Sequence, residues 1–220
     1  MRAVMRNIVC LISGRGSNLA ALLAAAREQR WAQTLDARIA AVISNRREAA
    51  GLAIAAAAGV PTAAVAHTDF ASREDFDRAL MAAIDAHRPT LVVLAGFMRV
   101  LTAPFVAHYE GRMINIHPSL LPSFRGLATH RQALAAGVRV HGATVHFVSS
   151  AVDGGAIIAQ AVVAVRSDDT EQTLAARVLE QEHRLLPRCV RLLLEGAVVL
   201  RDGRVEVAAG RDAELVVSGW

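Results

Sequence analysis

The chain has 220 residues, of which 54% are hydrophobic, so it is long enough to bury a core, and intrinsically disordered proteins are excluded. Aromatic residues make up only 4%, a composition that suits helices packed on a sheet. The net charge of +4 favours anionic ligands. Because the basic residues form no long block with interleaved aromatics, nucleic acid is not an expected partner.

The chain carries few signals for secretion, membranes or metals. Cys10 and Cys189 lie far apart and form no Cys-x-x-Cys pair, so reduced thiols and a cytoplasmic location are expected, without a structural zinc site. The apolar run at residues 7–13 reads as a first strand, since it is short and lacks a convincing signal-peptide cleavage site. The Ala-rich stretch 52–66 is interrupted at Pro61 and is too short for a membrane span.

The first half of the chain alternates between strand and helix patterns. Residues 7–13 form a continuous apolar run, typical of a strand buried on both faces, and Asn18 is placed to cap the helix that follows. The next patterns predict strand 38–44, helix 48–58, strand 62–65, a helix after Ser72 and strand 90–95. This βαβ alternation predicts a parallel sheet.

The second half continues the alternation and ends in a hairpin. The patterns predict strand 113–117, helix 129–136, strands 143–149 and 157–165, and a long helix from 170 to about 195. Asp202-Gly203 joins strands 198–201 and 205–207 as a two-residue turn, while the tail beyond carries no clear pattern. We predict one domain over residues 1–220, an α/β fold with a doubly wound, mostly parallel sheet and helices on both faces.

The first candidate site is the loop 13–18, which has the sequence Ser-Gly-Arg-Gly-Ser-Asn. It lies between a buried strand and a helix, where backbone N–H groups and the helix dipole can hold a phosphate. The loop lacks the third glycine of a dinucleotide fingerprint and the Gly-Lys-Ser/Thr ending of an NTPase loop, so it supports neither NAD nor ATP. The structural alternative is a tight turn without a ligand.

The second candidate site is the end of strand 113–117. Asn115 and His117 alternate there, so their side chains point to the same face. An amide N–H can stabilise an oxyanion and an imidazole can move a proton, as attack of an amine on an acyl carbon requires. Taken alone, the pair is explained somewhat better by a structural asparagine and a histidine whose hydrogen bonds are satisfied in the core.

A carboxylate completes the candidate site. Asp153-Gly154-Gly155 follows a strand pattern, and Asp153 could orient His117 or a water, although a simple turn explains the same residues. We expect His67, His87 and His108 at the surface without a role. Acyl transfer by these groups needs no metal, and no metal is expected.

Four segments stand out together: loop 13–18, Leu-Ala-Gly-Phe-Met-Arg at 94–99, Asn-Ile-His-Pro-Ser-Leu-Leu-Pro at 115–122 and Asp-Gly-Gly at 153–155. In this order they resemble the folate-dependent formyltransferases, and in particular the phosphoribosylglycinamide formyltransferase family of purine synthesis. The resemblance implies formyl transfer from 10-formyltetrahydrofolate, as cosubstrate, to the amine of glycinamide ribonucleotide. Ribonucleotide binding is expected in the N-terminal half, with folate binding and catalysis in the C-terminal half, as a monomer or homodimer.

The resemblance also implies roles for individual residues. The catalytic residues are Asn115, His117 and Asp153, with His146 supporting the aspartate. The ribonucleotide-binding residues are Gly16, Ser17, Asn18 and Glu182. The folate-binding residues are Arg73, Met98, Arg99, Val100, Leu101 and Asn115.

Two features depart from the family pattern. Ala128 stands where the family commonly has histidine, and the loop 123–126, Ser-Phe-Arg-Gly, is similar to that of methionyl-tRNA formyltransferases. The alternatives are therefore another 10-formyltetrahydrofolate-dependent transferase, a hydrolase, or a catalytically silent nucleotide- or folate-binding module. The short segment after residue 195 argues against a tRNA-binding domain.

Overall fold

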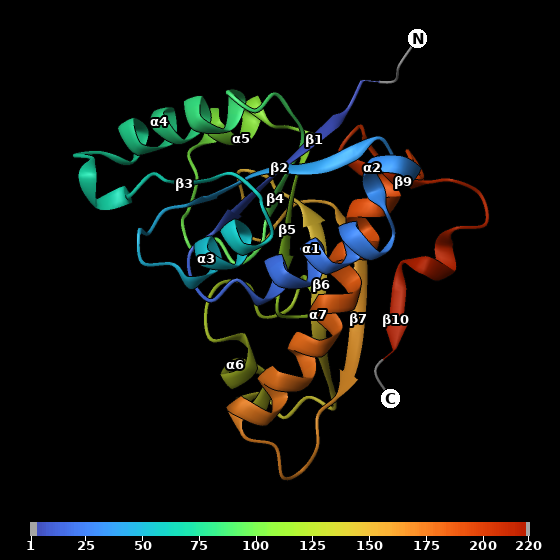
Figure 1. Cartoon of the computed structure of the whole chain (residues 1–220). Coiled ribbons are helices and arrows are strands. Elements are labelled where there is room, and N and C mark those ends of the chain that lie inside the picture. Colours follow the sequence, from blue (N-terminus) through green and yellow to red (C-terminus); the bar gives the residue numbers. More distant parts are fainter. Residues whose placement is uncertain (1–3, 219–220) are drawn as a thin grey trace. The chain divides into compact units, whose positions relative to one another are not determined.

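The computed structural model describes residues 4–218 and shows the predicted alternation of strands and helices (Figure 1). Eight strands form a mostly parallel sheet in the order β10-β7-β6-β5-β4-β1-β2-β3, which confirms the predicted fold class. The contacts group the chain into two compact units, Met1–Asn115 and Ile116–Trp220.

The first unit carries the parallel strands. Its elements are β1 (Arg6–Ile12), α1 (Ser17–Glu28), α2 (Trp31–Thr34), β2 (Ala37–Ser44), α3 (Ala50–Ala57), β3 (Thr62–Ala64), the 3-10 turn η1 (His67–Asp69), α4 (Arg73–Asp85), β4 (Pro89–Leu94), α5 (Ala103–His108) and the start of β5 (Met113–His117). The chain order reverses beside β1, because β2 pairs on one side of it and β4 on the other. Ligands of such folds bind beyond the carboxyl ends of strands at this reversal.

The second unit contains an antiparallel pair of strands in the main sheet, β6 with β7. Its elements are the end of β5, α6 (Thr129–Ala135), β6 (Val140–Phe147), β7 (Ile157–Ala164), α7 (Glu171–Leu194), β8 (Val198–Arg201), β9 (Arg204–Val207), the 3-10 turn η2 (Asp212–Glu214) and β10 (Val216–Ser218). β6 and β7 run antiparallel, while β10 runs parallel to β7. The predicted hairpin is confirmed as β8 and β9, joined at Asp202 (φ 50°) and Gly203 (φ 73°).

Three details differ from the sequence expectation. The cap of α1 is Gly16 (φ 78°) and the helix begins at Ser17, so the expected capping role of Asn18 is wrong. The short helices α2 and α5 carry too few residues for a helical period to be recognised. β10 lies in the tail, for which the sequence showed no pattern. It was not predicted because the strand that it pairs with, β7, lies far away in the sequence.

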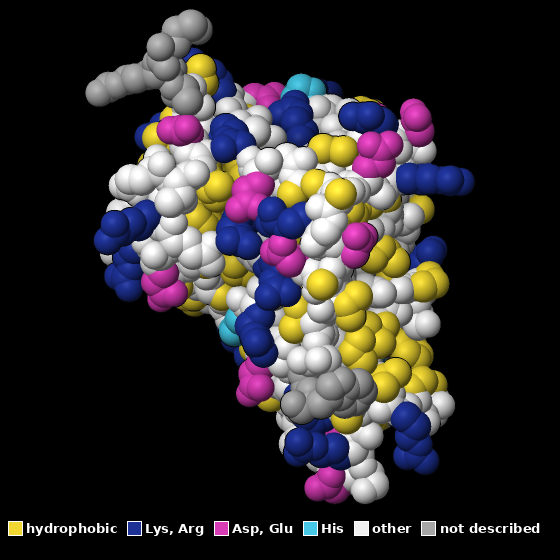
Figure 2. All heavy atoms as spheres, turned by 90° about the vertical axis from the view of Figure 1, so that its right-hand side faces the viewer, with side chains coloured by type: hydrophobic (Ala, Val, Ile, Leu, Met, Phe, Trp, Pro, Cys, Tyr) yellow, Lys and Arg dark blue, Asp and Glu magenta, His cyan; other side chains and the backbone are white. Residues whose placement is uncertain are grey.

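The surface charge is distributed without a dominant block on the face drawn in Figure 2, where basic and acidic side chains alternate. The sequence contains no lysine, so all 24 basic residues are arginines. Some of these arginines form ion pairs within the chain. Arg211 pairs with Glu195, the C-cap residue of α7, and with Glu214 of η2, so it links the tail to α7.

A partly buried ion pair fixes the start of α7. Both carboxylate oxygens of Asp169 accept hydrogen bonds from Arg177, at 2.8 and 2.9 Å, and the Asp169 side chain is only 2% exposed. The Arg166 backbone N–H and the Thr173 hydroxyl also donate to Asp169. Hydrogen bonds from Arg177 are the main cause that holds the pKa of Asp169 below its usual range. The pair therefore contributes stability above the ordinary carboxyl pKa, and that stability is lost as the pH falls.

We expect Asp169→Ala to lower the free energy of unfolding by about 2 kcal/mol at pH 7, because Arg177 loses the partner of a largely buried charge. Urea denaturation measures the change. Glu171→Ala is the matched control, because it breaks an exposed ion pair: the Arg131 side chain is 74% exposed and that of Glu171 is 37% exposed. This variant should lower the free energy of unfolding by less than about 1 kcal/mol. Equal losses in the two variants would contradict the assignment.

Candidate active site

The end of β5 carries the polar pair that the sequence singled out. Asn115 is half-buried and His117 is 5% exposed. Because they occupy alternate positions of one strand, both side chains leave the strand on the same side. β5 is paired with β4 through Leu94 and Asn115, so the strand position of Asn115 is fixed by the sheet.

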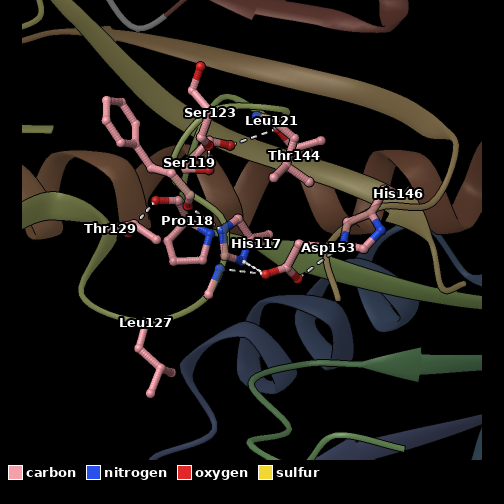
Figure 3. A network of polar contacts seen from close by, with 12 residues as sticks. His117, Pro118, Ser119, Leu121, Ser123, Leu127, Thr129, Thr144, His146 and Asp153 are labelled. Atoms are coloured by element: carbon pink, nitrogen blue, oxygen red, sulfur yellow. Dashed lines mark hydrogen bonds and ion pairs between the residues drawn. The ribbon is translucent and has the colours of Figure 1, made fainter. Parts of the chain in front are cut away.

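A strained turn brings a carboxylate to His117. Asp153 has φ 48°, a conformation that costs a non-glycine residue about 1 kcal/mol. A Cβ atom at Gly155 would fall 1.8 Å from the Phe147 carbonyl oxygen at the end of β6, so only glycine fits there. The turn places Asp153 Oδ2 3.3 Å from His117 Nδ1 (Figure 3). Strain at a charged residue beside a buried histidine is typical of a functional site.

The loop before α6 holds both members of this pair through its backbone. His117 Nε2 lies 3.0 Å from the Phe124 carbonyl oxygen, and the Gly126 N–H donates to Asp153 Oδ2 at 2.9 Å. Each ring nitrogen of His117 thus faces an acceptor. A histidine with a proton on both nitrogens can donate to both, whereas a neutral one can donate to only one.

His146 lies on the other side of the carboxylate. Its Nε2 atom is 3.8 Å from Asp153 Oδ1, and its Nδ1 atom is 2.9 Å from the Phe147 carbonyl oxygen. The side chain is buried, and this desolvation is the main cause that lowers the pKa of His146. The support of Asp153 by His146 stays a prediction.

Two polar residues of β6 and β7 anchor the loop that follows His117. The Thr144 hydroxyl donates to the Ser119 carbonyl and accepts from the Leu121 N–H, at 2.7 and 3.0 Å. The Gln160 amide donates to the Leu121 carbonyl at 2.9 Å and to the Thr144 hydroxyl at 3.1 Å. Sequence reasoning missed both residues. Their signal is a polar side chain inside an apolar strand pattern, which predicts a buried hydrogen bond without naming its partner.

A group of rings lies beside the same loop. The buried His141 ring stands edge-on to Phe124 and to His130, with centroids 5.8 and 5.3 Å apart. Burial is the main cause that lowers the pKa of His141 to about 4, and the nearby His130 and His117 lower it further. His141 therefore stays neutral in the folded protein at pH values where the unfolded chain is protonated.

This difference makes stability depend on pH. Between pH 6.5 and pH 4, His141 is protonated in the unfolded state but stays neutral in the folded state. As the pH falls through this range, the free energy of unfolding should therefore decrease by up to about 3 kcal/mol. We expect His141→Gln to reduce that loss, because the amide does not titrate. Urea denaturation of both proteins at pH 7 and pH 4.5 measures it, and an identical acid loss in both would contradict the prediction.

The candidate phosphate loop lies in the first unit. Gly16 packs so tightly on the start of α3 that an added Cβ atom would lie 2.6 Å from Gly51 Cα, and Gly51 N–H donates to the Gly14 carbonyl. The loop shape therefore requires glycine at position 16. Ser17 and Asn18 form the first turn of α1, whose N–H groups can receive an anion.

The structure distributes the other predicted residues over both units. Arg73 begins α4 and is exposed, while Met98, Arg99, Val100 and Leu101 form the connection between β4 and α5. Glu182 lies on α7 in the second unit and is 7% exposed. Ala128 is exposed, at the N-cap of α6, with φ 56°. Of the predicted site residues, the structure brings His117, Asp153 and His146 into direct proximity.

Residues 4–218 contain no group of three His, Cys, Asp or Glu side chains arranged to hold a metal ion. No helix in this part of the chain has the length and apolar character needed to span a membrane.

An amide, an imidazole and a carboxylate near strand ends of an α/β sheet can stabilise an oxyanion and move a proton, which is the chemistry that enzymes of acyl transfer require. The comparison with known families agrees: the chain belongs to the formyl transferase family, whose model matches residues 6–190.

Individual relatives are similar over most of the chain. Phosphoribosylglycinamide formyltransferase of Escherichia coli is 46% identical over 196 residues, which cover 89% of this chain and 91% of that protein. The trifunctional purine biosynthetic protein adenosine-3 of Drosophila melanogaster is 47% identical over 195 residues, which are 89% of this chain but only 14% of that protein. The crystal structure of glycinamide ribonucleotide transformylase 1 from Symbiobacterium toebii has a TM-score of 0.88 and 45% identity, covering 93% of this chain and 94% of that one.

Proposed function

We propose that this protein transfers the formyl group of 10-formyltetrahydrofolate to the amine of glycinamide ribonucleotide in purine synthesis. The products are formylglycinamide ribonucleotide and tetrahydrofolate. The names of the relatives support this reaction. The observation that carries it is the contact of Asp153 with His117 at the end of the strand that also bears Asn115.

The proposed reaction begins with attack of the ribonucleotide amine on the formyl carbon. A C–N bond forms, and the carbonyl oxygen becomes an oxyanion in a tetrahedral intermediate. The Asn115 amide and the protonated His117 ring stabilise this oxygen by hydrogen bonding. Since Asp153 occupies the Nδ1 side of His117, the substrate oxygen takes the place of the Phe124 carbonyl at Nε2.

The second step breaks the bond between the formyl carbon and N10 of the folate. The proton lost by the attacking amine must reach N10, so that tetrahydrofolate leaves as a neutral amine. Asp153 orients His117 and an ordered water that carries this proton. The transfer needs no covalent enzyme intermediate and no metal.

Both substrates draw on the first unit in this proposal. The ribonucleotide phosphate is held by Gly16, Ser17 and Asn18, with Glu182 of α7 as a further contact. The folate is held by Arg73, Asn115 and the segment Met98 to Leu101. The basic composition supports two anionic ligands. We further propose a cytoplasmic enzyme that acts as a monomer or homodimer.

A spectrophotometric assay for loss of the formyl group from 10-formyltetrahydrofolate tests the function. We expect consumption that requires glycinamide ribonucleotide and yields one formylated product per tetrahydrofolate. Consumption without the ribonucleotide would indicate a hydrolase. No consumption with it would indicate a different acceptor or a silent binding module, and the proposed function would be wrong.

A further inference from the structure

The connection between β4 and α5 has no regular structure of its own, although it contains the residues proposed to bind the folate. Residues 97–102 are neither helix nor strand. Within residues 4–218, the backbones of Arg99, Val100 and Leu101 make no hydrogen bond to the rest of the chain. Because its middle has no backbone hydrogen bonds, the conformation of this segment depends on the contacts at its two ends.

One end of the segment is held by Ser13. The Met98 N–H donates to the Ser13 hydroxyl at 2.7 Å, and that hydroxyl donates in turn to Asn45 Oδ1 at 2.6 Å. Ser13 is 6% exposed and Asn45 is 2% exposed, so water does not compete for these bonds. The Asn45 side chain is itself fixed, because its amide contacts His67 Nδ1 at 3.1 Å. His67, expected at the surface without a role, is thus half-buried in this network.

The other end is held by α4. The Thr102 N–H donates to Asp77 Oδ2 at 2.7 Å, and Asp77 is 1% exposed. Between the two ends, the Arg99 guanidinium lies over the ring of Phe76, 6.0 Å from its centroid. The two flanking side chains point away from these contacts into solvent: Met98 is 67% exposed and Val100 is 53% exposed. The hydrogen bonds to Ser13 and Asp77 thus fix the backbone of the segment, while the apolar side chains of Met98 and Val100 stay available to a ligand.

We propose that Ser13 and Asp77 are positioning residues for formyl-donor binding, because they fix the two ends of the segment Met98 to Leu101. The inference rests on the proposed function and adds two residues to which no binding role was assigned. Ser13 is the first residue of the candidate loop 13–18, ahead of the proposed phosphate-binding residues 16–18, at the point where β1 and β4 adjoin. The same hydroxyl therefore joins the start of the ribonucleotide loop to the start of the folate segment.

Steady-state kinetics with each substrate varied in turn test the proposal. Ser13→Ala should raise the KM for 10-formyltetrahydrofolate about fivefold, as loss of one buried hydrogen bond predicts. Asp77→Ala should raise it about tenfold or more, because the lost acceptor is a carboxylate. The KM for glycinamide ribonucleotide and the kcat should stay within about threefold, since the lost interaction contributes to donor binding alone.

Matched variants separate positioning from general damage. Ser44→Ala removes another buried hydroxyl, one that accepts from the Arg46 N–H and does not touch the segment, and it should leave the donor KM unchanged. Asp77→Asn keeps an oxygen for the Thr102 N–H and should restore the donor KM to within about threefold of the unmodified protein. If Asp77→Ala fails to fold, the donor KM of Ser13→Ala, compared with that of its control Ser44→Ala, tests the proposal.

Calorimetric titration with tetrahydrofolate, the product, gives a second readout that requires no turnover. We expect its affinity to fall in Ser13→Ala and to be retained in Ser44→Ala. An active unmodified enzyme whose Ser13→Ala variant keeps its donor KM and its tetrahydrofolate affinity would overturn this inference. Equal rises in both KM values would overturn it too. An unmodified protein that does not consume the donor would overturn the proposed function instead.

Discussion

Asn115→Ala should lower the single-turnover rate of formyl transfer by about 10²-fold to 10³-fold, the usual effect of losing one oxyanion donor. The side chain lies on the interior strand β5, so its removal leaves the backbone pairing with Leu94 in place. The KM values should change little, because the lost bond strengthens only as the oxyanion forms. Rapid-quench measurement at saturating concentrations of both substrates gives the rate.

Asn7→Ala is the control for this variant. Asn7 is also a strand asparagine, but it lies at the start of β1, where its amide donates to the His87 carbonyl at 2.7 Å. This is the amino end of the strand, opposite the edge that binds ligands. Its rate should stay within about threefold of the unmodified protein. A similar rate for Asn115→Ala would remove Asn115 from the chemical step.

Asp153→Asn should lower kcat by about 10²-fold to 10⁴-fold, the range that acid–base groups contribute. The substitution keeps the size of the side chain but removes the negative charge beside His117 Nδ1. It also presents either an amide N–H or a neutral oxygen to the Gly126 N–H and the His117 ring. The imidazolium then loses its counter-charge, and the proton path loses its orienting group. Steady-state kinetics and a thermal unfolding curve together measure the effect.

The matched control is Asp85→Asn, because Asp85 also lies close to a histidine, 2.8 Å from His108, but with both side chains more than 40% exposed. Removing this surface charge should leave kcat within about twofold. If Asp153→Asn keeps a comparable kcat while folding normally, the contact between Asp153 and His117 is structural.

Interior strands such as β1 and β4 could be predicted from sequence because they are short apolar runs that the sheet buries on both faces. Their residues after the first two are buried in both strands. The helix α5 could not be predicted in this way. It has six residues and begins next to Thr102, whose N–H is bonded to Asp77, a residue of α4. A contact between distant segments leaves no periodic pattern in either of them.

The candidate site shows the same division. Alternation on a strand predicted that Asn115 and His117 share a face, and the glycines after Asp153 predicted a turn. The contacts of Phe124 and Gly126 with this pair use backbone atoms, so their residue types carry no signal. The roles of the ligand-binding residues stay predictions, which rest on the resemblance and on the experiments described above.

The position of Asn115 and His117 on a single strand has a consequence for engineering. Alternate residues of a strand are about 6.6 Å apart along the chain, and the hydrogen bonds of the sheet maintain that spacing. Rearranging a loop therefore changes what surrounds the two side chains without changing the distance between their backbones. A library that seeks a new formyl acceptor should vary residues 14–18 and 123–128 and retain β5.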